Sequence, residues 1–433
     1  MALIYSLVLF LVGIVFYYHR KGAYFFHYFF LWITLAPLLY SIPFDMNRDE
    51  YWTILAWASK LGDFALLDAF LRWGNKFNKQ LKGLLVCLMI AMIYVVFLIL
   101  LRGLPTVQYI KYGLECFSII AGIAMFTSRE IDYNSFYKLL KVGFVFELFV
   151  GLIQVFYQPL NYKGALSGNE VLFVNGTFFG NNTFIEFLTC LGFLIFYLEY
   201  KQRGKLTRFS LLLCAILAYL VYESGVRMAL AAMLIPLGYF IYVYFKKRKN
   251  KASVVVYLVI AIIVAIPIVK SITSFVSNSS VTYTRDATSV AERQAVMASI
   301  LIDNTYLLEH TTLGLSYNIV MALPDNPILG PGRYFTSKGY EGYSYKEGSS
   351  ITDATLALFI GEFGIIGLFI IGYMLKILLC KINNRNRGAL VIAAYLLIIS
   401  LTDNGIFGAI NLFSLISMIM LEKHCEITRV SSK

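Results

Sequence analysis

Six side chains in this sequence are singled out as candidates to bind an anion or move a proton. An arginine side chain stays charged in proteins and its planar fork can bind two anion oxygens at once, whereas a carboxylate or an imidazole can accept a proton. The arginines are Arg227, Arg285, Arg293 and Arg333, and the proton acceptors are Asp353 and, as the alternative, His310. Whether these groups form one site depends on the elements that position them.

Those elements are predicted to be membrane-spanning helices. The chain has 433 residues, of which 59% are apolar and only 14% charged, which excludes an ordinary soluble domain. A bilayer is spanned by about 20 apolar residues, and about 12 apolar runs approach that length. They are residues 2–18, 23–42, 83–101, 107–126, 136–156, 183–200, 209–222, 228–245, 254–270, 354–379, 389–401 and 406–421. Residues 51–73 are a further candidate that carries four charges and also suits an interfacial helix.

Basic residues predict the orientation of these helices. The net charge is +12, and the lysines and arginines recur in alternate connections at 201–208, 246–251 and 381–387 and at the C-terminal end. Loops rich in lysine and arginine are cytoplasmic, so the connections at 159–182, 223–227, 271–353 and 402–405 should be external. In a multi-pass membrane protein this charge reports orientation, and we expect no nucleic-acid partner.

The sequence divides into three parts, and the middle one differs in composition. Residues 1–270 hold the N-terminal and central helices, residues 271–353 form one long external loop, and residues 354–433 hold the last helices and a cytoplasmic tail. Residues 272–350 contain five basic and seven acidic side chains, so arginines here are not orientation charges. Helical spacing at 291–309 predicts short helices within the loop. The predicted fold is an all-α polytopic membrane protein with about 12–13 transmembrane helices.

Each candidate residue also has a purely structural interpretation. Arg227 begins a span on the external side, where an ionisable residue suggests function but can also snorkel to lipid headgroups. Arg293 can pair with its neighbour Glu292 on the surface, and Asp353 can cap the helix that follows it. Arg285 and Arg333 can simply be solvated. No acidic pair or cysteine group with metal-ligand spacing stands in an external segment, so we expect neither a metal nor a cofactor.

Four short segments together resemble a known family. They are Gly176-Thr177-Phe178 with Asn181-Asn182, Glu223-Ser224-Gly225-Val226-Arg227, Glu292-Arg293 with Asn326-Pro327-Ile328-Leu329-Gly330-Pro331-Gly332, and Glu362-Phe363-Gly364-Ile365-Ile366-Gly367. In order and spacing they resemble the superfamily of O-antigen polymerases (Wzy) and O-antigen ligases, bacterial inner-membrane proteins. The resemblance covers roughly residues 175–367. Ligases of this superfamily carry a histidine where this chain has Asp353, so the polymerase is favoured.

The resemblance implies an integral-membrane glycosyltransferase of the bacterial inner membrane. Such an enzyme joins undecaprenyl-pyrophosphate-linked oligosaccharide repeat units at the periplasmic face, in the biosynthesis of lipopolysaccharide or another polysaccharide. The implied roles are diphosphate binding for Arg227 and then Arg293, Arg333 and Arg285, and general base for Asp353 or His310. Implied partners are the lipid-linked oligosaccharide, the lipid bilayer and a polysaccharide chain-length regulator.

Two alternative functions remain open at this point. An O-antigen ligase would transfer the glycan to the lipid A core instead of to another repeat unit, and the absence of the expected histidine counts against it. A transporter of lipid-linked sugars would usually show internal repeats, and we find no convincing repeat between the two halves of the chain.

Overall fold

The computed structural model describes about a third of the chain, in several stretches. The described residues are 86, 89, 90, 93, 94, 96–98, 100, 101, 133–157, 174, 176, 181–224, 229, 232–246, 327–330, 355–376, 387–400, 414, 415, 417–422, 424 and 425. The expected spans 2–18, 23–42, 107–126 and 254–270, the candidate span 51–73 and the expected short helices at 291–309 all lie outside these residues.

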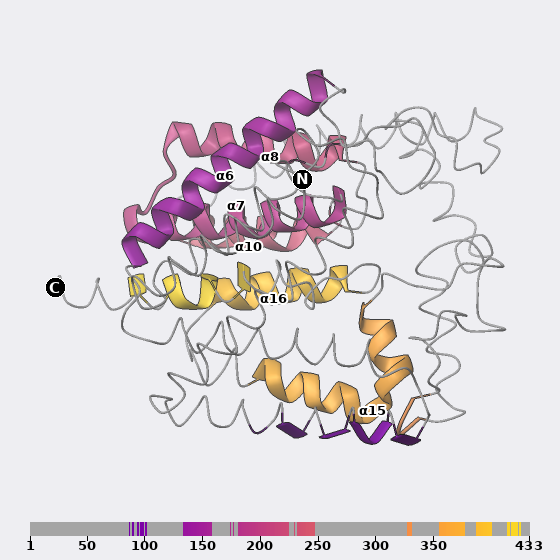
Figure 1. Ribbon diagram of the computed structural model, residues 1–433. Coiled ribbons are helices and arrows are strands. Elements are labelled where there is room, and N and C mark those ends of the chain that lie inside the picture. Colours follow the sequence, from indigo (N-terminus) through magenta and orange to yellow (C-terminus); the bar gives the residue numbers. More distant parts are fainter. Residues whose placement is uncertain are drawn as a thin grey trace, which may run out of the picture.

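Within this described part all regular structure is helical and there is no strand (Figure 1). The labelled helices are α6 (Tyr133–Phe156), α7 (Asn181–Arg203), α8 (Arg208–Glu223), α10 (Leu234–Lys246), α15 (Thr355–Lys376) and α16 (Arg387–Ile399). By length and composition alone, the stretches Tyr133–Phe156 and Asn182–Arg203 could each cross a membrane. The helical class is therefore confirmed for the described residues.

Four of the expected spans coincide with observed helices. The runs 136–156, 183–200, 209–222 and 389–401 correspond to α6, α7, α8 and α16, with ends shifted by no more than three residues. Helices α8, α10 and α16 have 16, 13 and 13 residues. These three are shorter than the roughly 20 residues that cross a bilayer without tilt or thinning.

Two other expected spans coincide with helices that are interrupted. In the run 228–245 a turn at Met233 precedes α10, close to Pro236, which lacks an N–H and crowds the carbonyl four residues before it. In the run 354–379, α15 is broken at Gly364, whose φ of 59° and ψ of −155° are not helical. Figure 1 shows α15 as two limbs that meet at an angle.

Helices α7 and α8 are joined by a short connection with a defined stop and start. Gly204 has a φ of 72° and donates its N–H to the carbonyl of Tyr200 at 2.8 Å, which ends α7. Thr207 is extended and its hydroxyl accepts the N–H of Ser210 at 3.2 Å, which caps the start of α8. The chain therefore reverses direction within a few residues.

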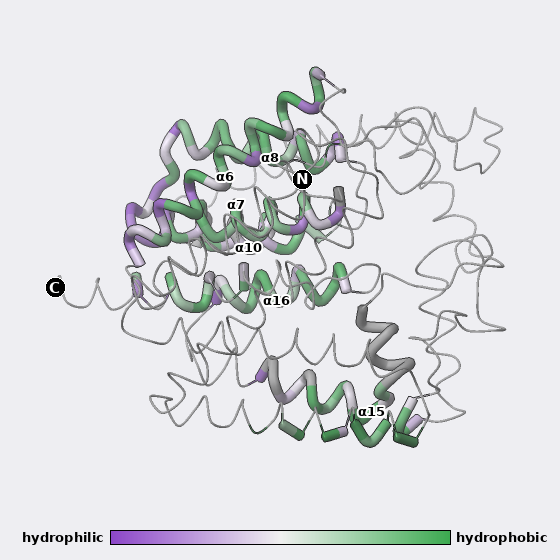
Figure 2. Tube along the Cα trace, in the orientation of Figure 1, coloured by the Kyte–Doolittle hydropathy of each residue, from purple (hydrophilic) through white to green (hydrophobic). Residues whose placement is uncertain are grey.

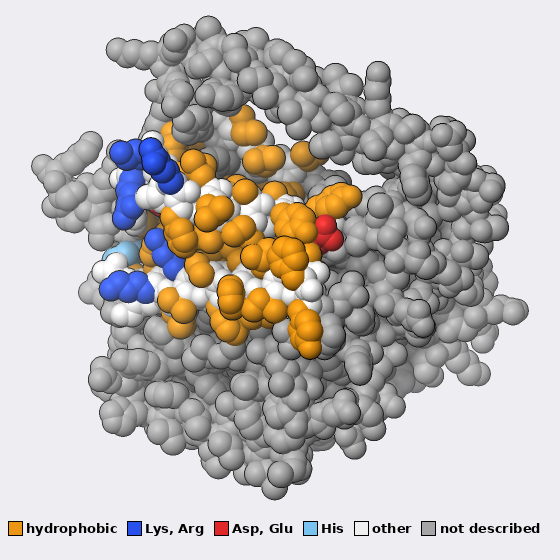
Figure 3. Space-filling model, turned by 90° about the horizontal axis from the view of Figure 1, so that it is seen from above, with side chains coloured by type: hydrophobic (Ala, Val, Ile, Leu, Met, Phe, Trp, Pro, Cys, Tyr) orange, Lys and Arg blue, Asp and Glu red, His pale blue; other side chains and the backbone are white. Residues whose placement is uncertain are grey.

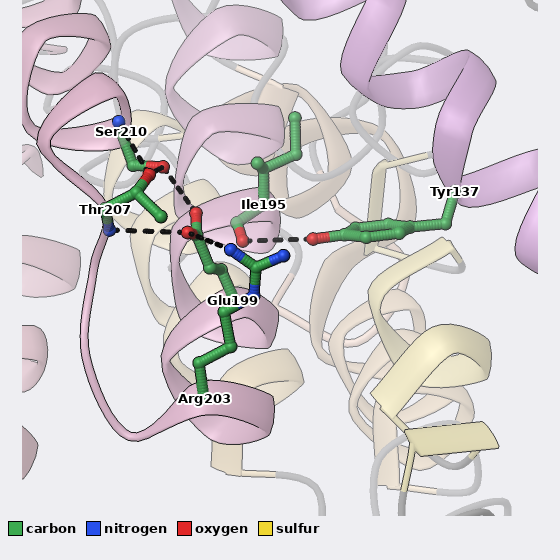
Figure 4. Close-up of polar contacts among 6 residues, drawn as sticks. All are labelled: Tyr137, Ile195, Glu199, Arg203, Thr207 and Ser210. Carbon is green, nitrogen blue, oxygen red and sulfur yellow. Dashed lines mark hydrogen bonds and ion pairs between the residues drawn. The ribbon is translucent and has the colours of Figure 1, made fainter.

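Glu199 of α7 ties this connection to the helix (Figure 4). Its carboxylate accepts the N–H of Thr207 at 3.3 Å and the hydroxyl of Ser210, and it lies 3.7 Å from a guanidinium nitrogen of Arg203. Because the carboxylate bonds both the cap and the first turn of α8, it sets the position of α8 against α7.

Helix α7 lies at the centre of the described helices. It packs against α6, α8 and α16, and 94% of its most apolar 18-residue stretch is buried, against 33% for α6. The rings of Phe184 and Phe187 from α7 and Phe144 from α6 are fully buried in this contact. Helices α6, α8 and α16 are therefore positioned in part by their contact with α7, while α6 and α8 also pack against each other and α10 packs against α16.

Apolar side chains cover much of the outer surface of the described helices, and several polar ones are inside. Phe149 of α6, Phe209 of α8 and Phe369 of α15 are each at least 60% exposed, whereas Glu147 and Glu186 are buried. Figure 2 shows hydrophobic residues along the helices, with hydrophilic ones gathered mainly toward one end. Of the two stretches that could cross a membrane, the one in α6 is more apolar and also more exposed than the one in α7.

The basic residues of these helices gather at one end, which we call the basic end (Figure 3). It contains the last turn of α7, with Lys201 and Arg203, and the first residues of α8 and α16, Arg208 and Arg387. The helical residues between 414 and 425 also end here, because Glu422 accepts from Tyr197 at 2.9 Å and lies 3.2 Å from Lys201.

The start of α6 belongs to the basic end as well. The ring of Tyr133 stacks on His424 with centroids 4.7 Å apart, and Tyr137 donates to the carbonyl of Ile195 of α7 at 3.3 Å. The alternation of basic connections predicted that residues 201–208, 381–387 and the C-terminal end lie on one side. The described helix ends next to these connections do lie together.

We expect cysteines at the basic end and in the long loop to react from opposite sides of a membrane. In a chain whose six cysteines are replaced by serine, Arg203→Cys should be labelled by a membrane-impermeant maleimide only from the cytoplasmic side and Lys338→Cys only from the other. Labelling of both after permeabilisation is the control. Labelling of both from the same side in intact cells would refute the predicted topology.

Candidate functional site

The six predicted site residues lie outside the described residues. The structure does not describe any of the six, so their mutual arrangement stays a prediction; they are Arg227, Arg285, Arg293, Arg333, His310 and Asp353. The structure does describe parts of the segments that carry the family resemblance. Gly176, Glu223 with Ser224, residues 327–330 and residues 362–367 are placed, and they form two close junctions between distant parts of the chain.

The first junction joins residues 327–330 to the break in α15. Ile365 donates its N–H to the carbonyl of Pro327 at 3.0 Å, and Ile366 donates to that of Ile328 at 3.5 Å. A broken helix exposes the N–H groups that begin its second limb, and here the carbonyls of a turn 38 residues earlier accept two of them. Two segments of the resemblance therefore meet through their backbones.

Glycine is required where these backbones meet. A Cβ atom at Gly364 would overlap the N atom of Gly330 and lie 2.5 Å from the carbonyl oxygen of Ile328. Gly330 itself has a φ of 77°. Tyr94 also belongs to this junction, because its hydroxyl donates to the carbonyl of Phe363 at 3.0 Å. We call residues 327–330, residues 363–366 and Tyr94 the turn–kink junction.

The second junction joins α6 to the segment that precedes α7. The side-chain amide of Gln154 donates from Nε2 to the carbonyl of Gly176 at 2.8 Å, and its Oε1 accepts the N–H of Gly176 at 2.7 Å. Gln154 is only 2% exposed, and Gly176 has a φ of 57°. One side chain therefore satisfies both backbone groups of a buried glycine, and we call this pair the Gln154–Gly176 clamp.

Close packing surrounds the clamp. A Cβ atom at Gly176 would overlap the ring of Phe184 and lie 2.7 Å from Oε2 of Glu147. On α6, Glu147, Gly151 and Gln154 are buried at helical spacing on one face. A Cβ atom at Gly151 would lie 2.9 Å from Phe184, so the glycine leaves room for that ring.

The Glu223-Ser224 segment ends α8 next to the same face of α6. Ser224 is buried and caps the helix, with its hydroxyl donating to the carbonyl of Val221 at 2.8 Å. Leu220, one turn earlier, lies against Gly151, where an added Cβ would approach it to 3.0 Å. Two more segments of the resemblance therefore lie close together, at the end of α6, α7 and α8 opposite the basic end.

Sequence analysis missed the buried polar residues that build this region. Glu147, Gln154 and Glu186 are buried in apolar helices, where an ionised carboxylate is costly unless it is hydrogen-bonded, paired or protonated. Their signal was available, since a polar residue within an apolar run is itself a functional hypothesis. The contact between Tyr94 and Phe363 had no such signal, because the two residues are 269 positions apart.

The described part of the site is a scaffold. The two junctions fix backbone segments through hydrogen bonds to main-chain groups and through glycines that admit close approach. Among the described residues, no group of three or more histidine, cysteine, aspartate or glutamate side chains could hold a metal ion.

Neither a comparison with protein-family models nor one with curated proteins found a match to this chain.

The turn–kink junction predicts that Gly364→Ala is destabilising. A backbone conformation restricted to glycine costs another residue about 1–3 kcal/mol, and the added Cβ also overlaps Gly330. We expect a lower midpoint of thermal unfolding for the variant in detergent, followed by circular dichroism.

Gly372→Ala is the matched control for this variant. Gly372 lies in the same helix, is exposed and has nothing within 4 Å of an added Cβ, so its substitution should change stability by less than about 1 kcal/mol. Equal midpoints for the two variants would show that the break in α15 does not need glycine.

Proposed function

We propose that this protein is a polysaccharide polymerase of the bacterial inner membrane. It joins undecaprenyl-pyrophosphate-linked oligosaccharide repeat units at the periplasmic face, as an integral-membrane glycosyltransferase. The observation that carries the proposal is the turn–kink junction, in which two segments of the resemblance, about 35 residues apart, are joined by hydrogen bonds from Ile365 and Ile366. A site built from both segments would require them to lie close together, and this contact supports the proposal to that extent.

The surface of the described helices supports a membrane location. Exposed aromatic and aliphatic side chains on α6, α8 and α15 suit lipid tails, while Glu147, Gln154 and Glu186 are shielded inside. The gathering of lysines and arginines at one end suits a cytoplasmic surface (Figure 3). In this proposal the chain is multi-pass, with about 12–13 transmembrane helices and residues 271–353 as the external loop.

The proposed reaction transfers a glycosyl group between two lipid-linked chains. The bond between the anomeric carbon and the diphosphate oxygen of the donor breaks, and a hydroxyl oxygen of the acceptor bonds to that carbon. Undecaprenyl pyrophosphate leaves with the electron pair, and the hydroxyl proton passes to the carboxylate of Asp353. Arg227, with Arg293, Arg333 and Arg285 as further candidates, binds the diphosphate and stabilises its growing charge.

The position of two proposed residues in the sequence fits this chemistry. Arg227 comes three residues after Ser224, which ends α8 at the end opposite the basic end. Arg333 comes three residues after Gly330 of the turn–kink junction. Arg227 thus lies close in sequence to the end of α8, and Arg333 close in sequence to the turn–kink junction. Asp353, in place of the histidine of the ligases, favours the polymerase over the ligase.

Reconstitution with a purified lipid-pyrophosphate repeat unit tests the proposal. We expect chain growth by the wild type without a nucleotide sugar. Asp353→Asn should lower the rate by about 10²–10⁴-fold, because it removes the proton acceptor. Arg227→Ala should reduce growth to a similar degree by weakening the hold on the diphosphate. The products are resolved by gel electrophoresis.

Arg203→Ala at the basic end is the control. The Arg203 side chain is 61% exposed, and its guanidinium lies 3.7 Å from the carboxylate of Glu199. Its growth rate should match that of the wild type. Normal growth by both site variants would refute the site assignment. Transfer of the lipid between leaflets without any chain growth would refute the polymerase and favour a transporter.

A further inference from the structure

Helix α6 has an exposed apolar face that begins at a cation. Lys138 is exposed, and the exposed side chains of Val142, Val145 and Phe149 follow it at helical spacing on the same side of the helix. Phe149 comes 11 residues after Lys138, which is about 16 Å along a helix. That length is about half of the hydrocarbon core of a bilayer, so this face matches one leaflet.

Helix α8 repeats this arrangement. Arg208 is its first residue and is exposed, and the side chains of Leu211 and Leu212, one turn further along, are each more than half exposed. The two helices pack against each other, and Figure 3 shows lysines and arginines at one end of a face on which hydrophobic side chains gather. A cation therefore stands at the edge of an apolar face on two neighbouring helices.

The carboxylates that the structure describes at the basic end are buried. Glu199 and Glu422 both hydrogen-bond to groups inside the protein. Their ion pairs, among the described residues, are with two other cations of α7. Neither carboxylate therefore cancels the charge that Lys138 and Arg208 present to the outside, and an anion from outside the protein can do so.

We propose that Lys138 and Arg208 bind the phosphate groups of anionic phospholipids in the cytoplasmic leaflet, whose acyl chains lie along the apolar faces of α6 and α8. A phospholipid carries its anion and its apolar chains in the same order as each face carries its cation and its apolar side chains. The long stems of lysine and arginine can lie on apolar surface while the charged group reaches the headgroup. This surface lies at the end opposite the proposed glycosyl transfer, so the inference goes beyond that function and does not depend on it.

The two parts of the surface together select the class of ligand. A soluble polyanion such as a nucleic acid would use the cations but leave the apolar faces exposed. A phospholipid without net charge would cover the apolar faces but gain less from the cations. An anionic phospholipid such as phosphatidylglycerol uses both parts.

Two other exposed cations of the basic end lack such a face. Arg203 ends α7, and Glu199 and Tyr200, in the turn before it, are both buried. Lys205 lies in the short connection between α7 and α8, outside either helix. Because these two residues carry the same charge at the same end, they separate the effect of the apolar faces from that of charge alone.

Lipid titration of the purified full-length protein in detergent, followed by native mass spectrometry, tests the proposal. Phosphatidylglycerol should bind more tightly than phosphatidylcholine with the same acyl chains. In the double variant Lys138→Gln with Arg208→Gln, the dissociation constants of the first two bound phosphatidylglycerol molecules should rise about fivefold, since a basic side chain near a membrane surface contributes about that factor. Binding of phosphatidylcholine should stay at the wild-type level, because the apolar faces are unchanged.

The double variant Arg203→Gln with Lys205→Gln is the matched control, because it removes the same number of charges from the same end. Its dissociation constants for phosphatidylglycerol should match those of the wild type. Inorganic phosphate is the second control. At matched ionic strength it should displace no more phospholipid than chloride does, because it has no chains to lie along the helices.

Three outcomes would overturn the inference. The first is equal affinity of the wild type for phosphatidylglycerol and phosphatidylcholine. The second is an equal weakening in the two double variants, which would attribute binding to net charge and not to these two faces. The third is displacement by inorganic phosphate, which would make this a site for free anions. The measurements use neither the lipid-linked oligosaccharide nor turnover, so a failure of the polymerase proposal would appear separately, in the reconstitution experiment.

Discussion

The burial of α7 on nearly all sides is the constraint on which helices α6, α8 and α16 depend. Helices α6, α8 and α16 all pack against it, and its polar residues must be accommodated inside the protein. At the basic end, Glu199 bonds the start of α8, while Lys201 and Tyr197 reach Glu422. The apolar middle of the helix then needs only close packing. Placement of its neighbours thus comes from hydrogen bonds at its ends and ring contacts between them.

At the two junctions, glycines allow backbone segments to approach more closely than a side chain would permit. Gly176 and Gly364 each have a positive φ and no room for a Cβ atom. Each is held by hydrogen bonds to its own or its neighbours' backbone, from Gln154 in one case and to residues 327 and 328 in the other. The segments that contain these residues are thereby fixed to the helices.

Sequence patterns predicted the helices better than the contacts between them. Apolar runs located α6, α7, α8 and α16 because burial of a helix needs a continuous apolar stretch. The break at Gly364 was missed, since glycine is common in membrane helices and only the approach of Gly330 makes this one special. The Gln154–Gly176 clamp depends on a contact between residues 22 positions apart, which hydropathy does not encode. The charged site residues, from Arg227 to Asp353, stay predictions.

The central claim is that substrate binds at the end of the helices opposite the basic end, against the proposed cations. A cryo-electron microscopy structure of the protein in a lipid nanodisc with the lipid-pyrophosphate repeat unit tests it most directly. The account predicts the diphosphate against Arg227, beyond the end of α8. Density for the diphosphate at the basic end, beside Lys201 and Arg387, would contradict it.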